Sequence, residues 1–248
     1  MTDTWPAERR AIVRDSAAIG LAAGAYAIGF GALSVASGLS VLQTMALSLI
    51  MFTGASQFAF IGVVGTGGSA LAASLAALML GLRNALYGLR MAPVLGVTGI
   101  RGFIAAQLTI DESTAMAIAR EDSSTRAARY AFWATGISIY LLWNGGTLIG
   151  ALGAGALGSP TTYGLDAVIP AAFLALLWPR LTGRQPWVIG VAIASALIAL
   201  ALTPVLQPGL PVLAASLVAI VVGLQSGLAL APPPSGNPHE NPSAGDDT

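Results

Sequence analysis

Two carboxylates stand side by side in the middle of a chain that is 55% hydrophobic and only 9% charged. They are Asp111 and Glu112, in the stretch LTIDESTAMA. Acids inside a membrane face a cavity, where they bind a cation or an ammonium group or carry a proton. A second interpretation stays open, because Thr109 and Glu112 have the spacing of a capping box, which would place both acids at the positive end of a helix.

A second polar stretch, MFTGASQFAF, places the small residues Gly54, Ala55 and Ser56 before the amide of Gln57. One interpretation is helix packing, in which small residues let a neighbour approach and Gln57 supplies an interhelical hydrogen bond worth about 1 kcal/mol. The other is a helix interruption whose free backbone groups meet a substrate. Serine chemistry at Ser56 needs a histidine base, and the only histidine, His239, lies in the polar tail.

The stretch GLRNALYGLR places Arg83 and Arg90 seven residues apart, so in a helix they share a face. A guanidinium keeps its charge in a protein, and at membrane depth it must be paired, hydrated or extended towards the headgroups. For Arg90 we favour extension to the headgroups, because Tyr87 nearby suits the interface. Arg83 follows a longer apolar run, so for Arg83 and its neighbour Asn84 an inner polar site is an equal alternative.

Composition sets the class of protein. A soluble domain carries about a quarter charged residues, whereas this chain has a mean hydropathy of +0.77, which predicts a polytopic membrane protein. The chain has no cysteine, which excludes disulfides and thiolate metal sites, and its net charge of zero gives no sign of a nucleic-acid partner. We expect no cofactor and no metal, and the chain shows no ATP-binding motif.

The elements expected to carry these residues are membrane helices of roughly 20 residues. Breaks are expected in the stretch FGALSVASGLS and before Glu112, where a helix should resume after an interruption. The predicted fold is therefore an all-α bundle of seven or eight segments with broken helices. The candidate segments are 17–36, 41–64, 69–89, 91–119, 131–153, 165–177, 187–202 and 212–230.

The arginines predict orientation, because basic residues concentrate on the cytoplasmic side. Three clusters lie at 9–14, 120–129 and 180–184. Placing all three in the cytoplasm gives eight crossings, or seven if one broken segment is re-entrant, with the N-terminus in the cytoplasm and the chain in the plasma membrane.

We divide the chain into a cytoplasmic segment 1–16, a transmembrane transport domain 17–230 and a disordered polar tail 231–248. A faint likeness between the segments that begin at Gly38 and Gly164 raises the hypothesis of an inverted repeat.

Five motifs in order, FGALSVASGLS, MFTGASQFAF, GLRNALYGL, LTIDESTAMA and GLDAVIPAAFLALLWP, resemble the AzlC family, the large subunit of branched-chain amino acid exporters. The resemblance runs from about residue 20 to 230. It implies export of amino acids such as leucine, isoleucine, valine and methionine, with a small membrane partner of the AzlD type. The chain departs from the family in having Asn84 after Arg83, where a histidine is usual, and in having Ile110 between Thr109 and Asp111.

The resulting hypothesis is a secondary transporter, expected to be an exporter, for an amino acid with an apolar side chain. Alternatives are a transporter of another small organic solute, or a non-transporting subunit of a membrane complex. An enzyme is disfavoured, because no nucleophile–base set is present. If transport is coupled to protons, Asp111 or Glu112 is the carrier. The candidate substrate-binding residues are Gly54, Ala55, Ser56, Gln57, Arg83, Asn84, Asp111 and Glu112.

Overall fold

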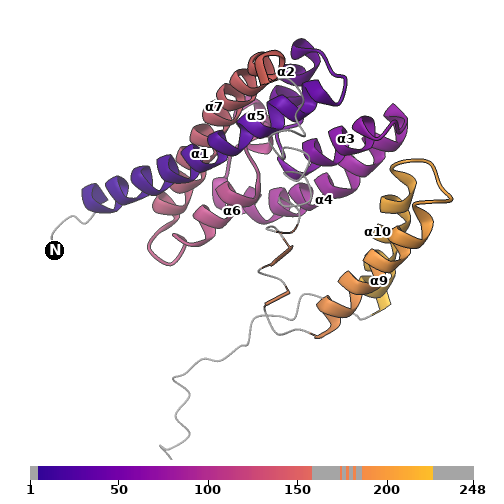
Figure 1. Cartoon of the computed structure of the whole chain (residues 1–248). Coiled ribbons are helices and arrows are strands. Elements are labelled where there is room, and N and C mark those ends of the chain that lie inside the picture. The colour runs from indigo at the N-terminus through magenta and orange to yellow at the C-terminus, as the bar shows by residue number, and fades with distance from the viewer. Residues whose placement is uncertain (1–4, 158–173, 175–176, 179–180, 183–185, 226–248) are drawn as a thin grey trace, which may run out of the picture.

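The computed structural model describes residues 5–157, 174, 177–178, 181–182 and 186–225. Every regular element within these residues is a helix, which confirms the predicted all-α bundle (Figure 1). Three of the described helices are long and apolar enough to cross a membrane, and four shorter apolar helices of 10–17 residues accompany them.

The two longest helices, α1 (Trp5–Ala36) and α7 (Thr125–Leu157), run side by side (Figure 1). Glycines allow this close approach: a methyl group on Gly146 would overlap the carbonyl of Gly24, and one on Gly150 would overlap the carbonyl of Ile28. Membrane helices associate through such small residues, because lipid gives them no hydrophobic driving force. The helix α1 ends at Ala36, within the stretch FGALSVASGLS where a break was predicted, and a turn follows at 37–40.

Buried hydroxyl pairs join the helices that meet at this contact. Ser16 and Thr135 lie 2.8 Å apart and connect α1 to α7. The helix α2 (Val41–Ile50) is joined to α7 by the hydroxyl of Ser48, which donates to Thr147 at 3.3 Å. Each of these hydroxyls has a partner within the protein, as buried polar groups require.

The predicted single span 41–64 is wrong, because the chain forms two short helices there. After α2 ends, α3 (Ala55–Gly65) begins at a new direction, and Gly54 between them has a φ of +61°. That backbone conformation is strained for residues with a side chain, so glycine suits the break. Of the two interpretations of MFTGASQFAF, the interruption is the one the structure contains.

A second break lies between α5 (Gly99–Gln107) and α6 (Asp111–Ile118). This break was predicted, and the helix resumes at Asp111, next to the predicted position near Glu112. The helix α4 (Ala70–Leu95) precedes this pair, and at Gly96 the backbone turns left-handed with a φ of +60°. The expected span at 69–89 therefore extends by six residues, and Pro93 lies inside its last turn.

The last described helices are α9 (Pro186–Leu202) and α10 (Leu210–Gln225), which pack against each other, and α10 contacts α4. They match the segments expected at 187–202 and 212–230. The segment expected at 165–177, the second half of the hypothesised repeat and the polar tail lie almost wholly outside the described residues.

Candidate functional site

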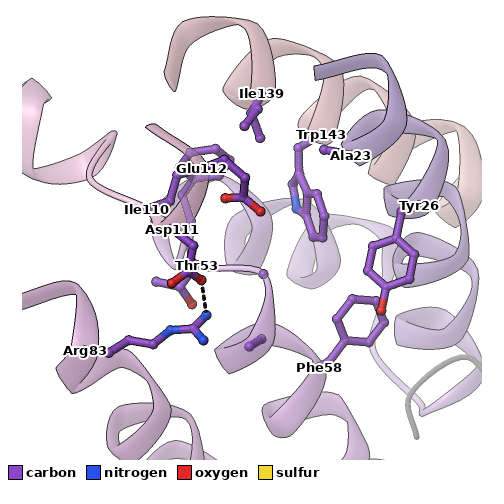
Figure 2. Close-up of a pocket in the computed structure, with 13 residues that line it drawn as sticks. Ala23, Tyr26, Thr53, Phe58, Arg83, Ile110, Asp111, Glu112, Ile139 and Trp143 are labelled. Carbon is purple, nitrogen blue, oxygen red and sulfur yellow. Dashed lines mark ion pairs between the residues drawn. The ribbon is translucent and has the colours of Figure 1, made fainter. Parts of the chain in front are cut away.

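Both helix breaks open onto one cavity of about 300 Å³. Its walls come from α1, from the break between α2 and α3, from α4, from the start of α6 and from α7 (Figure 2). Segments far apart in the sequence therefore meet around a single volume, at the low end of the range for small-molecule sites. The charged groups of the wall are Arg83, Asp111 and Glu112.

The acid pair occupies the first two positions of α6. The predicted capping box is wrong, because the residue that caps this helix is Ile110 and not Thr109. The hydroxyl of Thr109 donates to the carbonyl of Ala105 at 2.7 Å, in the preceding helix. The reciprocal contact of a capping box comes instead from Ser113, whose hydroxyl accepts from the amide of Ile110 at 3.1 Å.

This shift of one residue has a consequence for Glu112. In a box capped by Thr109 its carboxylate would reach back to the backbone. With Ser113 in that role, the carboxylate of Glu112 points into the cavity, as Figure 2 shows. Among the described residues Glu112 forms no ion pair. The helix start therefore places the acid against a cavity instead of using it for capping.

The neighbouring acid is paired. A guanidinium nitrogen of Arg83 lies 2.6 Å from a carboxylate oxygen of Asp111, and the two side chains are 30% and 31% exposed. The Nε of Arg83 is buried and has no hydrogen-bond partner. The question left open for Arg83 is thus answered geometrically: it faces the cavity (Figure 2). Arg90, for which we favoured the headgroup region, is about half exposed and pairs with Glu121 at 2.5 Å.

The break before α3 is bridged by Gln57. Its side-chain oxygen accepts from the amide of Gly54 at 3.2 Å, and its side-chain nitrogen donates to the carbonyl of Leu47 at 3.3 Å. These two bonds tie the start of α3 to α2, so Gln57 fixes the shape of the break and does not line the cavity. The hydroxyl of Thr53 lines the cavity and has no partner.

An aromatic wall stands opposite the charged groups. It consists of Tyr26 from α1, Phe58 from α3 and Trp143 from α7, with ring centroids 5.0 to 6.4 Å apart. Trp143 is only 6% exposed, yet its indole N–H has no partner. Figure 2 shows that the nitrogen edge of this ring is turned towards Glu112. A buried donor without an acceptor costs about 1–3 kcal/mol, so this wall retains a polar group that folding alone does not use.

Five of the eight predicted substrate-binding residues line the cavity: Gly54, Ala55, Arg83, Asp111 and Glu112. The other three, Ser56, Gln57 and Asn84, do not. The hydroxyl of Ser56 and the side-chain oxygen of Asn84 are buried without a partner.

The other eight of the thirteen lining residues were not predicted as site residues, and they include Thr53, Tyr26 and Trp143. Threonine and aromatic residues within apolar stretches have the pattern of ordinary packing, so their types gave no signal.

Comparison with known proteins adds a family. Residues 18–157 match the family model described as AzlC protein, and every residue that lines the cavity falls inside that range. The chain is 31% identical over 179 residues to the inner membrane protein YgaZ of Escherichia coli, covering 69% of this chain and 72% of that protein.

A second relative is an uncharacterized membrane protein of Archaeoglobus fulgidus, which is 32% identical over 174 residues. That match covers 69% of this chain and 74% of the relative. No solved structure gives a significant match.

Proposed function

This chain belongs to the AzlC family of membrane proteins, and on that premise we propose that it is a secondary transporter of amino acids with apolar side chains. The observation that carries the proposal is the cavity at the two helix breaks, which presents one cation, two acids and an aromatic wall. A zwitterion with an apolar side chain needs those three kinds of partner. Broken helices that meet around a site are typical of secondary transporters.

The substrate carboxylate is assigned to Arg83. A guanidinium recognises a carboxylate through two parallel hydrogen bonds, and such charge-assisted bonds are about twice as strong as neutral ones. In the structure a carboxylate oxygen of Asp111 lies 2.6 Å from a guanidinium nitrogen of Arg83. The substrate carboxylate therefore has to compete with Asp111, while the unpartnered Nε of Arg83 and the hydroxyl of Thr53 offer two further donors.

The substrate ammonium is assigned to Glu112. Because Arg83 and Asp111 neutralise each other, Glu112 leaves the cavity with one uncompensated negative charge among its lining residues. An ammonium group supplies the missing positive charge. If the cycle is coupled to protons, Glu112 is also the better carrier of the two acids, because it has no basic partner among the described residues.

The apolar side chain is assigned to the aromatic wall of Tyr26, Phe58 and Trp143, with Ile139 beside it. Burial of an aliphatic group against these rings is favourable, whereas a charged side chain would lose its hydration there. This wall therefore favours substrates such as leucine, isoleucine, valine and methionine over lysine or glutamate.

The direction of transport and the assembly complete the proposal. The resemblance to AzlC-type exporters supports export across the plasma membrane, together with a small membrane subunit of the AzlD type. The arginine clusters support a cytoplasmic N-terminus. A substrate or ion gradient would then drive transport, because the sequence shows no ATP-binding motif.

The test is counterflow of labelled leucine into liposomes that contain this chain with and without a co-expressed small subunit. Glu112→Gln removes the negative charge with almost no change in size, and we expect uptake to fall by about tenfold or more. Asp122→Asn is the matched control, because Asp122 is an exposed acid outside the cavity.

Equal uptake by wild type, Glu112→Gln and Asp122→Asn would show that Glu112 does not bind the substrate ammonium. Absence of leucine counterflow in every preparation, while another solute exchanges, would replace the substrate class. Absence of any exchange would favour a non-transporting subunit.

A further inference from the structure

Away from the central cavity, three arginines gather in a second pocket at one end of the bundle. It has a volume of about 510 Å³ and shares no lining residue with the first cavity. The first residues of α1 and of α7 form it, and we call it the terminal pocket. Its lining residues are Trp5, Arg9, Thr125, Arg126, Arg129, Tyr130 and Trp133.

The described residues hold the guanidinium groups of the terminal pocket in place without forming an ion pair with them. The guanidinium of Arg126 lies 4.1 Å from the ring centroid of Trp5. The Nε of Arg9 donates to the hydroxyl of Tyr130 at 3.2 Å, and the Nε of Arg129 donates to a backbone carbonyl at 2.7 Å. Among the residues that the structure describes, no acid lines this pocket. Three fixed positive charges therefore face an open volume.

Two other arginines at this end of the bundle form ion pairs with acids. Arg120 pairs with Asp15 at 2.9 Å, and Arg90 pairs with Glu121 at 2.5 Å. These acids are thus engaged with arginines outside the terminal pocket. The charge of the pocket is left for a ligand, and the ligand that suits three guanidinium groups is a phosphate-type anion.

The surface below the pocket indicates what the anion is attached to. On α7, residues 126, 130, 133, 137 and 141 are spaced by four, three, four and four, so they lie along one face of the helix. Below the pocket this face carries Ile137 and Leu141, which are 47% and 65% exposed. A basic head region with two tryptophans and a tyrosine therefore leads into an exposed apolar stripe, which suits an amphiphile better than a soluble anion.

We propose that the terminal pocket binds the phosphate of an anionic phospholipid headgroup, whose acyl chains lie along the stripe of α7. Basic pockets between helices on the cytoplasmic side are a known way to bind anionic headgroups. This site is separate from the transport cavity, and the proposal does not rest on the transported substrate.

The experiment uses the full chain purified in a neutral detergent and titrated with phosphatidylglycerol or with phosphatidylcholine, with bound lipid counted by native mass spectrometry. Wild type should prefer phosphatidylglycerol. Arg9→Gln and Arg126→Gln should each lower that affinity by about fivefold and leave phosphatidylcholine binding unchanged. Arg101→Gln is the matched control, because Arg101 is exposed on α5 and does not line the pocket.

A further variant separates charge from shape. Arg126→Lys keeps the charge but loses the planar group that stacks on Trp5, so its affinity should lie between those of wild type and Arg126→Gln. Circular dichroism and gel filtration in lipid-free detergent verify that each variant is folded. If Arg126→Gln does not fold, the binding measurement with Arg9→Gln tests the proposal.

Three results would overturn the proposal. Equal affinity for the two lipids would show that no anionic headgroup is recognised. A loss in Arg101→Gln as large as that in Arg126→Gln would assign the preference to general surface charge. Displacement of phosphatidylglycerol by inorganic phosphate alone would identify a site for a free anion.

Discussion

Along the contact of α1 with α7, buried hydroxyls pair with each other, as Ser16 does with Thr135. On the cavity wall a few turns away, the hydroxyl of Thr53 and the indole N–H of Trp143 have no partner. Both regions use the same kinds of polar group in apolar surroundings. Folding thus satisfies the hydroxyls of the first region, whereas the second region keeps two donors that have no acceptor among the described residues.

The same contrast holds for the backbone. Both α1 and α7 are continuous helices. They pack so closely that the carbonyl of Gly24 on α1 takes up the space where a side chain on Gly146 of α7 would lie. At the cavity the chain breaks twice between helices, and α6, which begins at one of these breaks, carries the charged residues Asp111 and Glu112 in its first turn. Changes in the first region should therefore alter stability, and changes in the second should alter transport. Four predictions test that division, in order of decreasing effect.

The largest effect is expected from Arg83→Gln, which should lower leucine counterflow by about a hundredfold, because a charge-assisted pair with the substrate contributes about 3 kcal/mol. The single change also leaves Asp111 without its partner. In the double variant Arg83→Gln/Asp111→Asn neither charge remains unpaired, so thermal stability should return to that of wild type while counterflow stays low. Recovery of counterflow in the double variant would make the ion pair purely structural.

The next effect concerns the tight contact. Gly146→Ala should reduce the free energy of unfolding by about 2 kcal/mol, because a methyl group there overlaps the carbonyl of Gly24. Gly145→Ala is the matched control at the preceding residue, where nothing lies within 4 Å of the added Cβ. Thermal unfolding in detergent measures both. If the two variants melt alike, the close approach of α1 and α7 is not what stabilises this contact.

A smaller effect is expected from Trp143→Phe, which removes both the unpartnered indole N–H and one of the two fused rings of a buried side chain. Loss of the unpaired donor stabilises the fold, whereas the space left by the missing ring destabilises it, so the free energy of unfolding should change by less than about 1 kcal/mol. Leucine affinity in the same protein should fall by about fivefold, because the donor is then missing for the ligand. Unchanged leucine affinity would show that the indole N–H takes no part in binding.

The smallest effect is expected from Ser16→Ala, which leaves Thr135 without its partner at the contact of α1 and α7. Interhelical hydrogen bonds in membranes contribute about 0.6 kcal/mol on average, so the melting temperature should fall slightly and counterflow should not change. A drop in counterflow larger than the drop in stability would mean that the two regions are coupled.

The sequence by itself determined the class of protein, because a chain with so few charged residues cannot form an ordinary soluble domain. It also predicted the break before α6, since glycines, a proline and two acids interrupt an apolar run there. Residue type was enough to single out Arg83, Asp111 and Glu112, because charge in an apolar chain is costly wherever it lies.

Only the tertiary structure decided which of these residues meet. Thr109 and Ser113 both have hydroxyls suited to capping, and the choice between them depends on how α5 and α6 join. That choice directs Glu112 into the cavity. Tyr26, Phe58 and Trp143 come from three helices, and their positions in the sequence do not predict that they line the same cavity. The physical reason is that helix periodicity fixes only the face on which a residue lies, whereas a cavity is fixed by the contacts between helices.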